Sequence, residues 1–124
     1  AFALSQVRSQ RRQGRSQLGI RKRLRQHKLD ETIINAALDS ADQHEANSEL
    51  LAACVFARRR RFGPFYRRQY YDAKDREAVI QRQLGSMARA GFGMAISNKV
   101  IRLENLGAAE MLIGQLEQGE DPTI

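Results

Sequence analysis

The spacing of apolar residues along the chain predicts a succession of amphipathic helices. Apolar residues recur at intervals of three and four, as in Ile80, Leu84 and Met87, which places them on one face of a helix. The same reasoning assigns Leu18 and Ile33 to buried faces. No stretch alternates apolar and polar residues for long, as a half-buried strand would. We therefore predict an all-α protein, with helices over residues 2–13, 17–26, 31–40, 46–61, 74–89, 94–103 and 108–118.

The residues between these helices supply start and stop signals. Gly14 can adopt the left-handed conformation that closes a helix, and Gly63-Pro64 prevents the preceding helix from continuing. Ser16 and Asp30 stand where N-caps are expected. Leu106-Gly107 is interpreted as a break between two helices. The aromatic and basic segment after Gly63-Pro64 is interpreted as a loop or a short helical turn.

An internal repeat is visible in the helical pattern. Residues 24–38 align with residues 87–101 at an offset of 63, each as helix, tight turn, apolar residue and helix. Apolar residues coincide at Leu24/Met87, Leu29/Phe92, Ile33/Ile96 and Leu38/Ile101. Tandem repeats of this kind form elongated, curved helical arrays; chance similarity between two amphipathic helix pairs is the alternative. We divide the chain into three-helix repeats over residues 1–41 and 42–103, and a C-terminal helix and polar tail over residues 104–124.

Charged residues are distributed in blocks along the chain. Their layout is more informative about the partner than the net charge of +7. Residues 1–29 hold nine Lys/Arg and no Asp/Glu, whereas residues 30–57 hold six Asp/Glu and no Lys/Arg. Residues 58–82 hold nine basic and three acidic residues. Two basic blocks separated by an acidic block favour a nucleic-acid partner, or a partner already bound to nucleic acid. Solvated helix faces rich in arginine are the alternative interpretation.

The basic blocks define two candidate contact surfaces. The first consists of the arginines on either side of Gly63-Pro64: Arg58, Arg59, Arg60, Arg61, Arg67 and Arg68. The second consists of the basic residues of the first two helices and their connection: Arg8, Arg11, Arg12, Arg15, Arg21, Lys22, Arg23 and Arg25. Arginines in such clusters suit contact with a phosphate backbone, which depends on salt and not on base sequence.

Aromatic residues lie beside the first surface. We assign Phe62 to the core. Two roles stay open for Tyr66, Tyr70 and Tyr71: they could stack on bases, or they could cover the core.

No catalytic constellation, metal site or cofactor motif is found. His27 and His44 have no neighbouring residue at metal-ligand spacing. Cys54, on an apolar helix face, is interpreted as a small buried hydrophobe.

Several classes of protein are excluded or disfavoured. No apolar run approaches the roughly 18 residues of a membrane span, and no signal peptide opens the chain. A single cysteine excludes an internal disulfide framework and fits a cytoplasmic protein. Because the chain begins with Ala1 and its first methionine is Met87, we expect it to be a piece of a longer protein.

Three blocks, in this order, complete the pattern: Ile20-Arg-Lys-Arg-Leu24-Arg-Gln-His-Lys-Leu29, Ala57-Arg-Arg-Arg-Arg-Phe-Gly-Pro-Phe65 and Met87-Ala-Arg-Ala-Gly91-Phe. Together they resemble the bacterial regulatory protein RecX family, whose members modulate the RecA recombinase. The likeness covers about residues 1–103. It implies that residues 1–41 and 42–103 are the second and third three-helix repeats of the family. Lys28 replaces the family's usual glycine, so we expect that turn to be closed differently. Gly14-Arg-Ser-Gln stands where the family has an aromatic segment.

The resemblance also implies a function. The chain would be a non-enzymatic regulator, without cofactors, that binds RecA filaments on single-stranded DNA. It would inhibit the ATPase and strand exchange of the recombinase, and so modulate DNA repair, recombination and the SOS response. Double-stranded DNA is a second candidate partner, no membrane partner is implied, and we expect a monomer. The family supplies no residue-level contact set, so the two surfaces rest on charge layout alone.

Two other functions stay open. The chain could be a sequence-independent nucleic-acid-binding protein unrelated to RecA. It could also be a helix-turn-helix-like transcriptional regulator that uses residues 17–40. A helix that reads the major groove carries base-contacting residues on the second helix of the motif. Here that helix is acidic and otherwise apolar, which disfavours the regulator.

Overall fold

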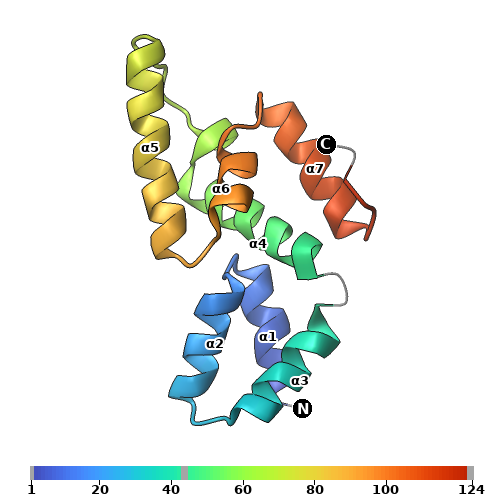
Figure 1. The fold of residues 1–124 in the computed structure, drawn as a ribbon. Coiled ribbons are helices and arrows are strands. Elements are labelled where there is room, and N and C mark those ends of the chain that lie inside the picture. The colour runs from blue at the N-terminus through green and yellow to red at the C-terminus, as the bar shows by residue number, and fades with distance from the viewer. Residues whose placement is uncertain (1, 43–44, 123–124) are drawn as a thin grey trace.

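The computed structural model describes residues 2–42 and 45–122 and, within these ranges, contains helices and no strand (Figure 1). This confirms the predicted all-α class. The elements are α1 (Phe2–Arg12), α2 (Gln17–Gln26), α3 (Glu31–Ala41), α4 (Glu45–Arg60), the 3₁₀ helix η1 (Gly63–Phe65), α5 (Ala73–Arg89), α6 (Met94–Ile101) and α7 (Leu106–Glu117).

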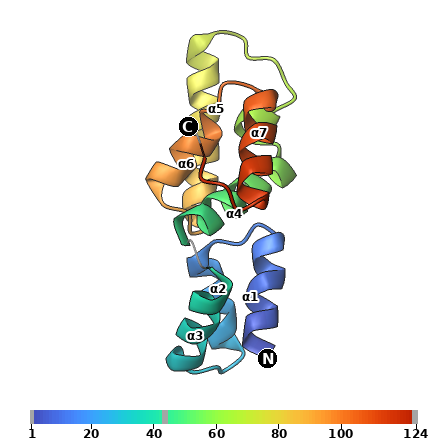
Figure 2. The ribbon, with the colours of Figure 1, turned by 90° about the vertical axis from the view of Figure 1, so that its right-hand side faces the viewer.

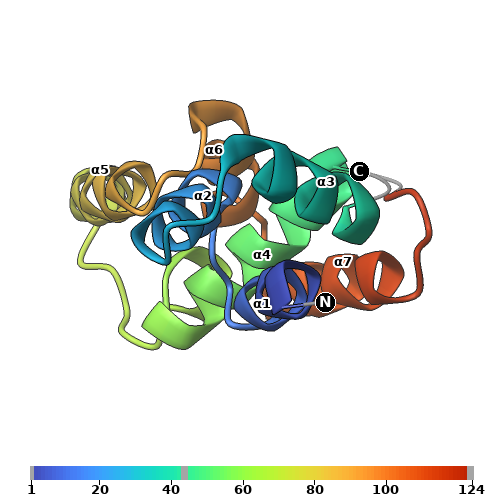
Figure 3. The ribbon, with the colours of Figure 1, turned by 90° about the horizontal axis from the view of Figure 1, so that it is seen from below.

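The helices form two units stacked into an elongated body. The lower unit in Figures 1 and 2 contains α1, α2 and α3, and the upper unit contains α4 to α7 with η1. Each unit has its own cluster of buried apolar residues, the lower one centred on Val7, Ile20 and Leu24, the upper one on Cys54, Ile80 and Met87. Helix α4 lies across the end of the lower unit and contacts α1 (Figures 1 and 3).

The turns that follow α2 and α5 have the same backbone structure. Lys28 has φ 62°, and Gly91, at the predicted offset of 63, has φ 96°. Corresponding amides donate to corresponding carbonyls: Lys28 to Arg25, Leu29 to Leu24, Gly91 to Ala88 and Phe92 to Met87. These bonds form the Schellman closure of a helix. The expectation that Lys28 closes its turn differently is therefore wrong, because the lysine adopts the left-handed conformation itself.

Side-chain caps explain where several helices begin. Ser16 and Asp30 accept amide hydrogen bonds at the start of α2 and α3, as predicted. Asp72 does the same for α5. The interpretation of Leu106-Gly107 as a break is wrong, because Asn105 caps α7 and the helix begins at Leu106.

Two apolar residues assigned to buried faces are exposed. Leu18 is 63% exposed and Ile33 is 45% exposed. Successive helical residues are about 100° apart, so a narrow face that contains Ile20 and Leu24 excludes Leu18. In α3 the buried face is likewise formed by Ile34 and its neighbours at helical spacing. Small three-helix units bury only a narrow stripe of each helix.

Cys54 is fully buried, which confirms its assignment to the core. Burial raises the pKa of its thiol to about 12, so the thiolate is suppressed.

His27 ends α2 and packs edge-on against Phe2, whereas His44 lies outside the described residues. None of the described helices is long and apolar enough to cross a membrane.

Replacement of Lys28 with glycine tests the conformation of the first turn. The left-handed backbone costs an L-residue about 1–2 kcal/mol and costs glycine little. Because glycine also adds freedom to the unfolded chain, we expect Lys28→Gly to raise the free energy of unfolding by about 0.5–1 kcal/mol. Urea denaturation followed by circular dichroism measures it. Lys22→Gly, inside α2, is the control and should lower stability by about 1 kcal/mol; destabilisation by both changes would contradict the structure.

Candidate nucleic-acid interface

The two units are joined by an ion-pair network around Arg11. The Arg11 guanidinium lies 2.6 Å from Asp42, which follows α3, and 2.5 Å from Glu49 on α4. Glu49 also accepts the backbone N–H of Gln17 at the start of α2. The side chains of Arg11, Asp42 and Glu49 are 11%, 4% and 15% exposed. Burial lowers the pKa of Arg11, but its hydrogen bonds to the two carboxylates outweigh burial and raise the pKa overall.

A second set of polar contacts ties the α1–α2 connection to the upper unit. The Ser16 hydroxyl donates to the Ala90 carbonyl over 2.6 Å. Gly14, with φ 83°, lies so close to α4 that an added Cβ would be 2.8 Å from the Phe56 nitrogen. Only glycine permits this approach. The connection between α1 and α2 is therefore held against both α4 and the end of α5.

The end of α4 presents the arginine cluster from a rigid position. Arg58, Arg59 and Arg60 form the last turn, and Arg61 follows with φ 60°. The Phe62 amide donates to the Ala57 carbonyl and closes the helix. All four arginines are exposed. Because helical residues fan out by about 100° each, they do not form one patch.

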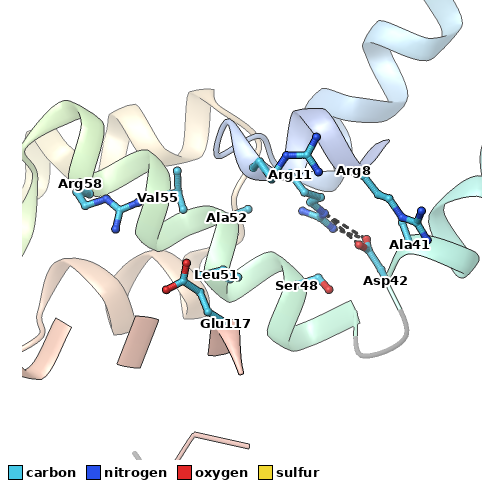
Figure 4. Close-up of a pocket in the computed structure, with 11 residues that line it drawn as sticks. Arg8, Arg11, Ala41, Asp42, Ser48, Leu51, Ala52, Val55, Arg58 and Glu117 are labelled. Atoms are coloured by element: carbon cyan, nitrogen blue, oxygen red, sulfur yellow. Dashed lines mark hydrogen bonds and ion pairs between the residues drawn. The ribbon is translucent and has the colours of Figure 1, made fainter. Parts of the chain in front are cut away.

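Arg58 faces a groove between α1, α4 and α7 (Figure 4). The groove has a volume of about 460 Å³. Its apolar wall comes from α4, from Leu51, Ala52 and Val55. Its charged rim consists of Arg8, Arg11, Arg12 and Arg58 with Asp42 and Glu117. Arg11 points to Asp42 in this view, so Arg8, Arg12 and Arg58 are the cations that a partner in the groove can reach.

Arg59 and Arg60 line a different cavity, of about 360 Å³, together with Arg15. The structure thus brings residues of the two predicted surfaces together in two places. Arg8 and Arg12 meet Arg58 at the groove, and Arg15 meets Arg59 and Arg60 at this cavity.

Three residues of the second predicted surface are paired within the chain. Arg11 is held by the network described above. Arg25 and Arg21 form ion pairs with Glu31, and Arg21 also donates to Asn35. The remaining predicted residues are without an ion-pair partner among the residues that the structure describes: Arg8, Arg12, Arg15, Lys22, Arg23, Arg58, Arg59, Arg60, Arg61, Arg67 and Arg68.

The aromatic residues on either side of η1 differ in their exposure to solvent. Phe62 packs against Phe56 and the upper core, which confirms its assignment to the core. Tyr66 and Tyr70 stack on each other with ring centroids 5.2 Å apart. Tyr71 is 93% exposed. Arg67 and Arg68 lie between these tyrosines on the exposed connection to α5.

The sequence reasoning missed the contribution of α7 to the groove. Glu117 lines it, and Leu112, Ile113 and Leu116 pack into the upper core. The apolar spacing of these residues was the available signal, but no sequence feature links α7 to α4.

Within the described residues, no group of three or more His, Cys, Asp and Glu could hold a metal ion.

Comparison with known proteins agrees with this architecture. The family model of the second three-helix domain of RecX matches residues 1–38, which correspond to α1–α3. The regulatory protein RecX of Agrobacterium fabrum (strain C58 / ATCC 33970) is 35% identical over 112 residues, which is 90% of this chain and 55% of that protein. The chain is similar to RecX regulatory proteins over most of its length.

A second RecX relative gives the same result. The regulatory protein RecX of Myxococcus xanthus (strain DK1622) is 36% identical over 101 residues, covering 82% of this chain and 51% of that protein. The chain therefore spans about half the length of the curated RecX relatives it matches. No solved structure shows a significant match.

Removal of the Arg11 guanidinium tests the network at the junction. Arg11→Met leaves two mostly buried carboxylates without their cation, and we expect a loss of about 3–5 kcal/mol in the free energy of unfolding. Arg8→Met removes an exposed arginine one turn earlier and should change stability by less than about 0.5 kcal/mol. Chemical denaturation of both variants measures the difference. Equal, small effects would show that the network does not hold the units together.

Proposed function

We propose that this chain forms the second and third repeats, residues 1–41 and 42–103, of a RecX-type regulator that binds RecA filaments on single-stranded DNA. In this proposal it inhibits the ATPase and strand exchange of the recombinase, acts in the cytoplasm without catalysing a reaction, and modulates DNA repair and recombination. Similarity to a RecX regulatory protein over 90% of the chain carries the proposal. Residues 104–124 add a C-terminal helix and a polar tail, and the helix packs on the third repeat.

The arrangement of charge supports a polyanionic partner. Unpaired arginines occur on both repeats, on α1, α2, the end of α4 and the connection to α5. The acidic block is largely used inside the chain: Glu31, Asp42 and Glu49 pair with arginines, and Asp30 caps α3. The arginines left over are the ones that a filament or a DNA strand can neutralise.

The polar contacts at the junction support docking on a regular partner. The network around Arg11 and the Ser16–Ala90 hydrogen bond set the spacing between the arginines of the two repeats. A filament repeats its binding surface at regular intervals, and a preorganised body loses less entropy when it binds than a flexible one.

Sequence-independent binding of nucleic acid without RecA is the second candidate function. The unpaired arginines on both repeats favour it by themselves, because backbone contacts require only positive charge. The transcriptional regulator is not favoured, because α3 would be its recognition helix and contains no Lys or Arg.

The RecA ATPase assay tests the first function directly. We expect that this chain, added to RecA on single-stranded DNA, lowers the rate of ATP hydrolysis at amounts below that of RecA. Titration of the same chain onto single-stranded DNA without RecA tests the second function. That function predicts an affinity for DNA that falls steeply as the salt concentration rises. An unchanged ATPase rate beside salt-dependent DNA binding would reject the first function and leave the second.

The arginines at the end of α4 should be required for inhibition. Replacement of Arg58, Arg59, Arg60 and Arg61 with alanine removes four exposed charges, and we expect the concentration for half-inhibition to rise about tenfold. A control variant loses four exposed charges outside the predicted surfaces: Lys74, Arg82, Arg89 and Lys99 to alanine. Circular dichroism checks that both retain their helices. If both variants inhibit equally well, the end of α4 has no specific role.

A further inference from the structure

The cavity lined by Arg15, Arg59 and Arg60 has the features of an anion site. It lies where the α1–α2 connection meets the end of α4, with Phe56 and Ala90 in its wall. Its volume of about 360 Å³ lies within the range of ligand pockets. Among the described residues that line it there is no Asp or Glu.

Arg15 is a partly buried cation without a counter-ion among the described residues. Its Nε is buried and makes no hydrogen bond within the described part of the chain. Burial and the nearby charge of Arg23 lower the pKa of its guanidinium. Burying a charged group without a partner is unfavourable. An anion in the cavity would supply the missing charge and the missing hydrogen-bond acceptor.

The other two arginines come from the third repeat, residues 42–103, and line the same cavity as Arg15. The guanidinium of Arg60 lies over the Phe56 ring, 5.0 Å from its centroid, and Arg59 is its neighbour in the last turn of α4. The close approach of Gly14 to Phe56 places the α1–α2 connection directly against this turn. Three guanidinium groups from two parts of the chain that are distant in sequence therefore line one cavity.

The start of α2 lies beside the cavity, but two of its first three amides already donate hydrogen bonds within the chain. The Gln17 amide donates to Glu49, and the Gly19 amide donates to Ser16. The arginines are therefore the groups that would hold an anion. Guanidinium groups donate pairs of parallel hydrogen bonds that match the oxygens of a phosphate group. Three of them around one cavity suit a phosphate better than a single carboxylate, whose two oxygens one guanidinium can satisfy.

We propose that the cavity between Arg15, Arg59 and Arg60 binds a phosphodiester group of a single-stranded nucleic acid. The choice of a single-stranded nucleic acid as the partner rests on the proposed function, whereas the position of the site does not. One phosphate would contact arginines of both repeats, so a bound strand would also strengthen the junction between them. The site is separate from the groove that contains Arg58.

Fluorescence titration of the whole chain with a single-stranded oligothymidylate, at several salt concentrations and without RecA, tests the site. For single strands, each phosphate contact contributes about 0.7 to the slope of log K against log salt. We expect Arg15→Gln to reduce the slope by about 0.7 and to weaken binding about tenfold. Arg82→Gln, an exposed position on α5 outside the predicted surfaces, is the matched control and should bind like the parent.

Nuclear magnetic resonance locates the ligand. Oligothymidylate should shift the amide signals of Gly14 and Gly19 in the parent and in Arg82→Gln, but not in Arg15→Gln. A methylphosphonate strand of the same sequence, which has an uncharged backbone, should leave them unshifted. Because Arg15 is partly buried, Arg59→Gln, at an exposed position of the other repeat, provides a second variant with little risk to folding. It should also reduce the slope.

The outcomes separate this inference from the proposed function. Equal slopes for Arg15→Gln, Arg59→Gln and Arg82→Gln would overturn the site even if the chain inhibits RecA. Shifts with the methylphosphonate strand would overturn phosphodiester recognition, and shifts with inorganic phosphate but not with the strand would show an adventitious ion only. The expected slopes and shifts would support the site even if the ATPase assay shows no inhibition.

Discussion

The paired charges around Arg11 are the interaction on which the arrangement of the two repeats depends. The apolar residues form two separate clusters, one in each unit, so no shared hydrophobic core sets how the units meet. Arg11 instead binds one carboxylate that follows α3 and one on α4, and Glu49 also accepts the first amide of α2. Sliding one unit against the other would leave buried charges unpaired, which is strongly unfavourable. The distances between the arginines of the two repeats follow from this network.

This network also explains the order of charged blocks along the chain. The acidic block between the two basic blocks supplies the partners of Arg11, Arg21 and Arg25. Part of the basic charge is therefore structural and is neutralised when the chain folds. Within the described residues, the arginines of the two predicted surfaces that stay unpaired lie on α1 and α2, on the α1–α2 connection, at the end of α4 and on the connection to α5. The proposed phosphate-binding surface and the internal network are thus built from the same residue type.

Helix geometry determines which arginines of the cluster at the end of α4 line the groove and which line the cavity. Four consecutive arginines in the sequence predict one patch, but side chains at successive positions of a helix point in different directions. Arg58 lines the groove with Arg8 and Arg12, whereas Arg59 and Arg60 line the cavity with Arg15. Each site combines cations from both repeats. A partner that contacts both sites must therefore extend across the junction, as a strand or a filament would.

The sequence alone was enough to assign the helices, the caps at Ser16 and Asp30, the repeat at an offset of 63 and the burial of Cys54, because spacing and capping are local properties. It did not determine which face of a short helix is buried: Leu18 and Ile33 are exposed, since the unit of α1, α2 and α3 covers only a narrow stripe of each helix. Nor could it show that Arg11 is structural while Arg15 is unpaired, although both lie in the same basic block. Only the tertiary structure decided this, because the carboxylates that bind Arg11 come from residues more than thirty positions away.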